Sequence, residues 1–128
     1  PYENESLNLK WTPWNLSTEI QDLSVIDIGI MPLPDDAWSR GKCGFKGLQY
    51  MSLGIPTVMS PVGVNKEIII HQENGFLASS DEEWFSILSE LIESKTLRDS
   101  VGAKGKQTIV EKYSVSANKD EYLRFFIL

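Results

Sequence analysis

The sequence predicts an α/β fold, in which a parallel sheet is covered by helices on both faces, and three observations carry this prediction. Short apolar runs alternate with segments of helical periodicity along most of the 128 residues. The runs are rich in isoleucine and valine, as strands buried on both faces usually are. Glycine and proline stand where helices and turns should end. Because crossovers between parallel strands are right-handed, the carboxyl ends of these strands should share one edge.

The first half of the chain predicts two strands, a short helix and a long loop. Residues 7–12 alternate apolar and polar side chains, as a half-buried strand does, and Pro13 ends the run. Ser17 is placed to cap a short helix. Residues 25–31 contain one charged side chain and predict a central strand buried on both faces. Residues 32–43 predict a loop of about a dozen residues, a length that is usually functional or disordered.

The middle of the chain predicts two further strands, each after a helix. Residues 45–53 predict a helix, which Gly54 at its end should terminate. Residues 57–59 predict a buried strand, residues 64–70 a helix, and residues 76–78 a short strand after a turn. This makes four strands with residues 7–12, whereas a complete doubly wound domain usually has about five or six. We therefore expect strands on the N-terminal side to be missing from the chain, which leaves dimerisation through a sheet edge open.

The C-terminal third predicts three helices. Two capping-box patterns, Ser79 with Glu82 and Ser80 with Glu83, precede an amphipathic segment. Ser94 is placed to cap a second helix that continues to about residue 113. A last helix is expected over residues 116–126.

Composition and charge exclude several classes of function. The net charge is −6 and the pI about 4.7, so general binding to nucleic acid or to an anionic membrane surface is not expected. The one cysteine, Cys43, excludes an intramolecular disulfide and a zinc cluster, and it agrees with a reducing, cytoplasmic location. No apolar run approaches the ~18 residues of a transmembrane helix. The first residues do not resemble a signal peptide, and without an initiator Met we expect a piece of a longer protein.

A glycine-rich, basic segment is the strongest candidate for a site. Three of the twelve basic residues, Arg40, Lys42 and Lys46, fall within seven positions of an acidic chain. Glycine lets a backbone approach an anion closely, and the first N–H groups of a helix are unpaired. The segment from Gly41 to Gly47 therefore predicts a phosphate or diphosphate site. It matches neither the P-loop nor the dinucleotide fingerprint, so a flexible loop with solvated charges is the alternative.

Other reactive residue types favour structural roles. Cys43 has no His or Asp arranged beside it, so nucleophilic catalysis is not expected. His71, before a turn, is expected to be structural or solvated. Asp35 and Asp36 could hold a metal, but no third ligand is visible and a solvated loop is favoured. Asp27 lies inside a predicted strand without acidic companions, which disfavours a receiver-type domain.

Several segments together resemble the group 1 glycosyltransferases. Residues 50–60, Tyr-Met-Ser-Leu-Gly-Ile-Pro-Thr-Val-Met-Ser, are similar to the family's Ala-Met-Ala-x-Gly-x-Pro-Val-Val-Ala-Ser. Residues 74–77 resemble its Asn-Gly-x-Leu strand, and residues 27–32 resemble the strand that enters its donor loop. Glu67 stands where the family often has Glu after the next turn. The resemblance covers roughly residues 12–115, and the order and spacing of the pieces are specific.

The resemblance implies a fold, a partner domain and a reaction. Family members have the GT-B fold, two Rossmann-like domains with the active site between them. The whole chain, residues 1–128, would be part of the C-terminal domain, with residues 114–128 facing an absent N-terminal acceptor domain. The family transfers sugars, here expected to be hexoses for polysaccharide biosynthesis, from a nucleotide-diphosphate sugar with retention and without a metal or other cofactor. The chain alone should be inactive, and the full-length enzyme could lie against the inner face of the membrane.

The resemblance also suggests roles for individual residues. Gln49 stands at the position of a family glutamate that holds the ribose hydroxyls. Another family glutamate, which touches the donor sugar, falls on Gly41, so sugar recognition must differ. Lys42 and Lys46 would face the diphosphate or the sugar. The predicted nucleotide-sugar site consists of Arg40, Gly41, Lys42, Gly44, Phe45, Lys46 and Gln49.

Three matters stay open at this point. No catalytic residue can be assigned from the sequence. Trp11 and Trp14 should pack at a junction of elements, although one could lie near the nucleotide base. The alternative function is a non-catalytic nucleotide-binding or protein-interaction module on the same kind of sheet.

Overall fold

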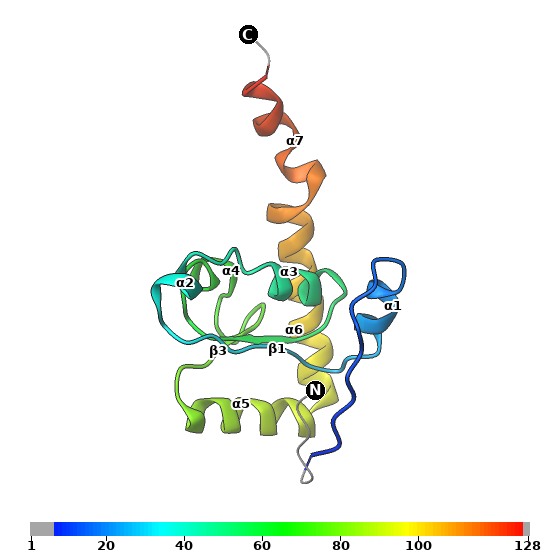
Figure 1. Ribbon diagram of the computed structural model, residues 1–128, viewed down its shortest axis with the longest axis vertical. Coiled ribbons are helices and arrows are strands. Elements are labelled where there is room, and N and C mark those ends of the chain that lie inside the picture. Colours follow the sequence, from blue (N-terminus) through cyan, green and yellow to red (C-terminus); the bar gives the residue numbers. More distant parts are fainter. Residues whose placement is uncertain (1–6, 127–128) are drawn as a thin grey trace.

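Three short parallel strands form the centre of the fold (Figure 1). The computed structural model describes residues 7–126. Strand β1 (Gly29–Met31) pairs with β2 (Thr57–Met59), which pairs with β3 (Phe76–Leu77), in the order β1-β2-β3. Because the strands are parallel, their carboxyl ends lie at one edge of the sheet.

Helices cover both faces of the sheet, which confirms the predicted three-layer α/β fold. Helices α3 (Phe45–Ser52) and α4 (Asn65–Ile68) lie on one face, and α5 (Asp81–Glu93) lies on the other (Figure 1). Helix α6 (Lys95–Thr108) packs against both α3 and α5. The two faces bury separate apolar clusters, one of Met51, Met59, Ile68 and Ile69, the other of Val58, Phe76, Ala78, Leu91 and Val101.

Serine side chains cap the N-termini of the C-terminal helices. Ser80 and Glu83 form a complete capping box on α5, so the second of the two predicted boxes is the real one. The hydroxyl of Ser94 caps α6, as predicted. A wider π-helical turn, η1 (Ile109–Tyr113), then leads to α7 (Val115–Arg124), which Ser114 caps. Helix α7 extends away from the sheet at the end of the molecule (Figure 1).

The predicted strand over residues 7–12 is wrong. Residues 8–15 have no regular structure, and the apolar side chains Leu7, Leu9 and Trp11 are exposed. An alternating pattern can form a strand only beside a neighbour that accepts its hydrogen bonds. No strand of the described sheet lies beside this segment, so the sheet has three strands and not four.

Three other details also differ from the predictions. Strand β1 is shorter than residues 25–31 and lies at an edge of the described sheet, with Ile30 exposed on one side. The loop over residues 32–43 contains a short helix, α2 (Ala37–Arg40), because Asp36 caps it. Helix α1 (Glu19–Ser24) begins without the predicted cap, since the Ser17 hydroxyl donates to the side chain of Asn15.

Candidate functional site

The loops at the carboxyl edge of the sheet are held together by Ser60, which follows β2. Its hydroxyl accepts a hydrogen bond from the backbone N–H of Leu33, which follows β1, at 2.9 Å. Its carbonyl accepts one from the buried side chain of Asn65, also at 2.9 Å. The exits of two neighbouring strands are thereby fixed relative to each other and to α4.

The N-terminus of α3 lies over this edge because two glycines allow close contact. Gly44 has a φ of +69°, and a Cβ there would stand 2.5 Å from Ile68 and 3.1 Å from Asn65. A Cβ at Gly47 would stand 2.5 Å from the sulfur of Met59, the last residue of β2. A residue with a side chain at either position would force the helix or these neighbouring side chains to shift.

Helix α3 begins without a side-chain cap. Of the four described helices with eight or more residues, α5, α6 and α7 each have a serine cap and α3 has none. Its cap residue is Gly44, which has no side chain to offer. The first N–H groups of α3 therefore remain available to an anion, and the helix dipole favours negative charge there.

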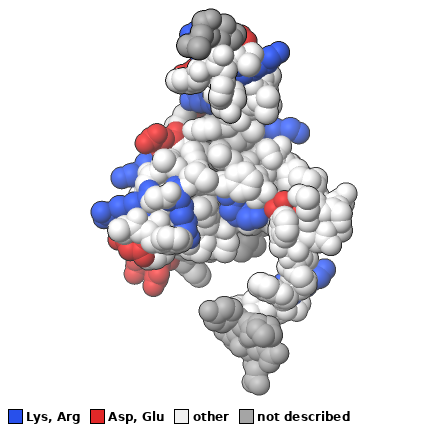
Figure 2. Space-filling view, turned by 45° about the horizontal axis from the view of Figure 1, so that its top comes forward, with Lys and Arg blue, Asp and Glu red and all other residues white. Residues whose placement is uncertain are grey.

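The three predicted cations each lie near a different carboxylate. The Arg40 Nε donates to Asp35 at 2.7 Å, and both side chains are largely exposed. Hydrogen bonds from Ser39 lower the pKa of Asp36, and the charge of exposed Lys42 lowers it further. Lys46 lies with its Nζ 3.6 Å from Glu19. On the face of the molecule that Figure 2 shows, Lys and Arg side chains likewise lie beside Asp or Glu side chains.

Glu19 at the start of α1 joins two of the predicted site residues. Its Oε1 accepts a hydrogen bond from Gln49 Nε2 at 2.9 Å and lies next to the Lys46 ammonium. The pKa of Glu19 is lowered, mainly by the bond from Gln49 and further by Trp14 and Lys46, so the carboxylate stays charged. The oxygen of the Gln49 amide is buried and has no hydrogen-bond partner among the described residues.

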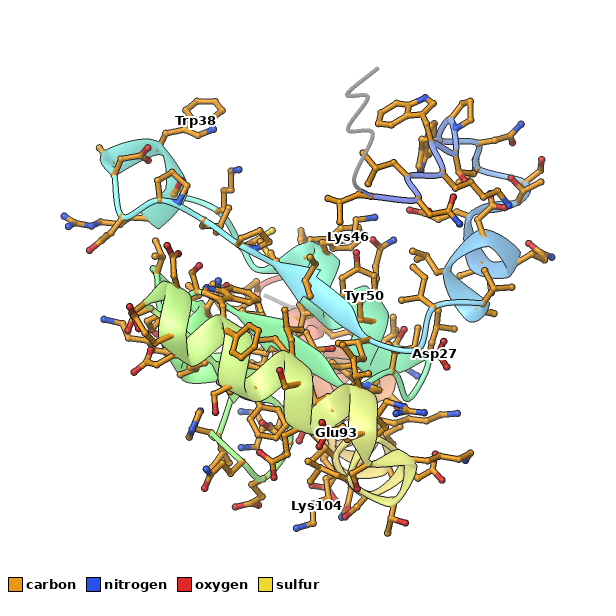
Figure 3. The ribbon with its side chains drawn as sticks, turned by 90° about the horizontal axis from the view of Figure 1, so that it is seen from below. Asp27, Trp38, Lys46, Tyr50, Glu93 and Lys104 are labelled. Atoms are coloured by element: carbon orange, nitrogen blue, oxygen red, sulfur yellow. The ribbon has the colours of Figure 1, made fainter. Side chains whose placement is uncertain are left out.

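Sequence reasoning missed Glu19 because nothing in the local pattern marks it. Thirty residues separate it from Gln49, and the two meet only because α1 lies beside α3. Figure 3 shows Lys46 and Tyr50 on α3, with α1 on one side and Trp38 of α2 well apart on the other. The structure thus brings Lys46 and Gln49 together around Glu19, while Arg40 is paired elsewhere.

A pocket of about 570 Å³ opens between α1, the irregular segment before it and the start of α3. Glu19 and Lys46 supply charged groups to its wall, and Trp14 and Pro13 supply apolar surface. Gln49 is not among the lining residues. The remaining lining residues are Lys10, Thr12, Asn15, Gln21, Asp22, Leu23, Val25 and Ile26.

Several acidic residues and His71, all outside this pocket, have structural roles. Asp35 pairs with Arg40, and Asp36 caps α2 through the N–H of Ser39. His71 accepts a hydrogen bond from the Leu77 N–H at its Nδ1, which agrees with the predicted structural role. Over residues 7–126, no three His, Cys, Asp or Glu side chains gather as metal ligands. No helix in that range has the length and apolar character needed to span a bilayer.

Comparison with known proteins identifies similar chains. The family model described as glycosyl transferases group 1 matches residues 7–94. The solved C-terminal domain of LpcC, a glycosyl transferase group 1 family protein from Francisella tularensis, is 22% identical, with a TM-score of 0.66. Anabaena Alr3699/HepE in complex with UDP and glucose is 20% identical, with a TM-score of 0.67. The search of curated proteins found no match.

The matched regions differ in extent between this chain and those structures. The LpcC alignment covers 81% of this chain and 53% of that one, and the HepE alignment covers 84% and 29%. The chain thus spans about half of the LpcC domain and under a third of HepE. At 20–22% sequence identity, the likeness to these two structures shows the fold of the chain.

Proposed function

Because the chain belongs to the group 1 glycosyl transferases, we propose that it is the donor-binding part of an enzyme that transfers a sugar from a nucleotide-diphosphate sugar to an acceptor. The observation that carries this proposal is the uncapped N-terminus of α3, which lies over the carboxyl edge of the sheet beside Lys46. Ligands of open α/β sheets bind outside this edge. A diphosphate there would receive N–H donors, a favourable dipole and an ammonium group.

The predicted residues would bind different parts of the donor. Gly44 and Phe45 lead the backbone of α3 toward the phosphates, with Gly44 in a conformation that favours glycine. Lys46 would stabilise the negative charge that grows on the leaving diphosphate during transfer. Arg40, Gly41 and Lys42, which lie before the helix, would contact the outer phosphate or the sugar. Gln49 would act toward the nucleoside through its hydrogen bond to Glu19.

The donor class is supported by the solved relatives. The HepE structures are described as complexes with UDP, with UDP and glucose, and with UDP-glucose. We propose that the donor of this protein is likewise a nucleoside-diphosphate hexose. The proposed transfer retains the anomeric configuration, needs no metal and serves polysaccharide biosynthesis in the cytoplasm.

The acceptor would be held by a second domain that this chain does not contain. Helix α7 offers a surface for that domain, since Val115, Tyr122, Phe125 and Phe126 are all at least 64% exposed. A further pocket of about 440 Å³ lies along it, lined by residues that include Tyr113 and Leu123. The predicted interdomain segment extends to residue 128, of which the last two residues lie outside the described range. Without the acceptor domain, the chain alone should bind the donor but not transfer its sugar.

Calorimetric titration of the full chain with UDP, GDP and ADP tests the proposal. One of the three should bind, and Lys46→Ala should weaken that binding about ten- to a hundredfold, as expected for a hydrogen bond to a charged group. Lys104→Ala is the matched control, because it removes the same charge from an exposed position on α6. A chain that ignores all three nucleotides would instead favour a protein-interaction module. Equal affinities of Lys46→Ala and Lys104→Ala would remove Lys46 from the site.

A further inference from the structure

The Glu19 carboxylate is held in place by the residues around it. Its side chain is 18% exposed, it accepts the bond from Gln49, and the Lys46 ammonium lies 3.6 Å away. A charge this well shielded needs partners, and the neighbouring donors supply them. Glu19 is therefore a fixed acceptor in the wall of the pocket and not a mobile surface carboxylate.

Gln49, by contrast, has no acceptor atom to offer a ligand. A carboxylate can only accept, so its bond fixes the Gln49 amide with Nε2 toward Glu19. The amide oxygen is consequently turned into the protein, where it is buried. Gln49 is absent from the pocket lining, whereas Glu19 is part of it. Of these two residues, it is Glu19 that faces the pocket.

The carboxylate retains acceptor capacity toward the pocket. Two ionised oxygens provide about four lone-pair sites. Gln49 and Lys46 both approach Oε1, and Trp14 is the remaining neighbour that lowers the pKa of the group. At least one lone-pair site is left for a ligand. The adjacent ammonium offsets the negative charge, so the same ligand can carry phosphate.

We propose that Glu19 is a specificity-determining residue of the donor site, whose carboxylate accepts hydrogen bonds from vicinal hydroxyls of the bound nucleotide sugar. This inference rests on the proposed function. The diol belongs either to the ribose or to the transferred sugar, since both present the same hydroxyl chemistry. Gln49 is then a positioning residue that acts through Glu19, and Lys46 binds the phosphate beside it.

The test combines a change of residue with a change of ligand. Glu19→Gln keeps the shape of the side chain and replaces half of its acceptor capacity by donors. Its matched control is Glu90→Gln, which removes the same charge from the exposed side of α5, on the far face of the sheet (Figure 1). The full chain is titrated with the nucleoside diphosphate that binds best, with its 2′,3′-dideoxy analogue and with the corresponding nucleotide sugar.

If the ribose supplies the diol, Glu19→Gln should weaken binding of the nucleoside diphosphate at least tenfold and leave the dideoxy analogue unchanged. If the transferred sugar supplies it, only the nucleotide sugar should lose affinity. Glu90→Gln should match the wild type with every ligand. Should Glu19→Gln fail to fold, Glu19→Asp should show the same pattern, because it keeps the charge but shortens the side chain by one methylene.

Two results would overturn the inference, and they can be told apart. Wild-type binding combined with undiminished or tighter binding by the Glu19 variants would show that Glu19 is not a ligand of the hydroxyls, and the proposed function would stand. Absence of nucleotide and nucleotide-sugar binding by the wild type would end both the inference and the proposed function.

Discussion

Gly47 of α3 lies directly against Met59 of β2, so that a Cβ at position 47 would stand 2.5 Å from the Met59 sulfur. Met59 is fully buried and ends the central strand at the carboxyl edge. The contact sets how closely α3 approaches the sheet. It thereby places the N-terminus of the helix, and Lys46 next to Gly47, at the candidate site.

Replacing Gly47 by alanine should therefore destabilise the protein. Overpacking of a buried contact costs about 1–3 kcal/mol, and the better helix propensity of alanine returns up to ~1 kcal/mol. We expect a net loss of about 1–2 kcal/mol in the free energy of unfolding, measured by urea denaturation. Gly41→Ala is the control, because its Cβ would meet nothing nearer than 3.5 Å. Equal urea midpoints for the two variants would contradict this account of the packing.

A charge exchange tests the contact between Glu19 and Gln49. Gln49→Glu places a second carboxylate where the amide now donates at 2.9 Å, so two like charges would face each other. The variant should unfold at lower urea concentration than the wild type at pH 7. Adding Glu19→Gln restores one donor and one acceptor, and the midpoint should recover. A double variant no more stable than Gln49→Glu alone would show that the two side chains do not interact.

The cap of α2 predicts a specific dependence of stability on pH. Hydrogen bonds from Ser39 lower the folded-state pKa of Asp36 below its ordinary value of 3.8. A carboxylate whose folded pKa is lowered adds stability above its unfolded pKa, and this is lost as the pH falls through the folded value. Asp36→Asn keeps a capping acceptor but does not titrate. The loss of stability between pH 6 and pH 3 should therefore be smaller in Asp36→Asn than in the wild type, as followed by urea unfolding at each pH. Identical pH profiles would count against this role.

The elements that the sequence predicted well are those whose signals are local. Residues 57–59 form a strand because a short β-rich run is bounded by Pro56 and a turn. The start of α5 follows from the pairing of Ser80 with Glu83, three residues apart. The predicted phosphate segment likewise includes a glycine at the start of a helix, and that helix begins at Phe45.

The predictions that failed depend on neighbours distant in sequence. Residues 7–12 have the alternation of a strand, but a strand also needs a partner, and the pattern contains no information about one. Asp36 is an exception, because its contact is local. It was interpreted as a solvated loop residue, but it accepts a hydrogen bond from the N–H of Ser39 and caps the four-residue helix α2. The role of Glu19 needed both α1 and α3 in place.

The sequence by itself determined the alternation of strands and helices, the parallel sheet and the basic, glycine-led start of α3, since hydrophobic period, capping residues and turn residues act over a few positions. Only the tertiary structure decided which charges meet. Lys46 and Gln49 face Glu19 of another helix, and Arg40 faces Asp35. The choice of Glu19 as partner depends on how α1 and α3 are placed, and the place of α3 on the sheet is fixed by packing contacts such as that of Gly47 with Met59. Arg40 and Asp35 are only five residues apart, and their pairing depends on the turn into α2.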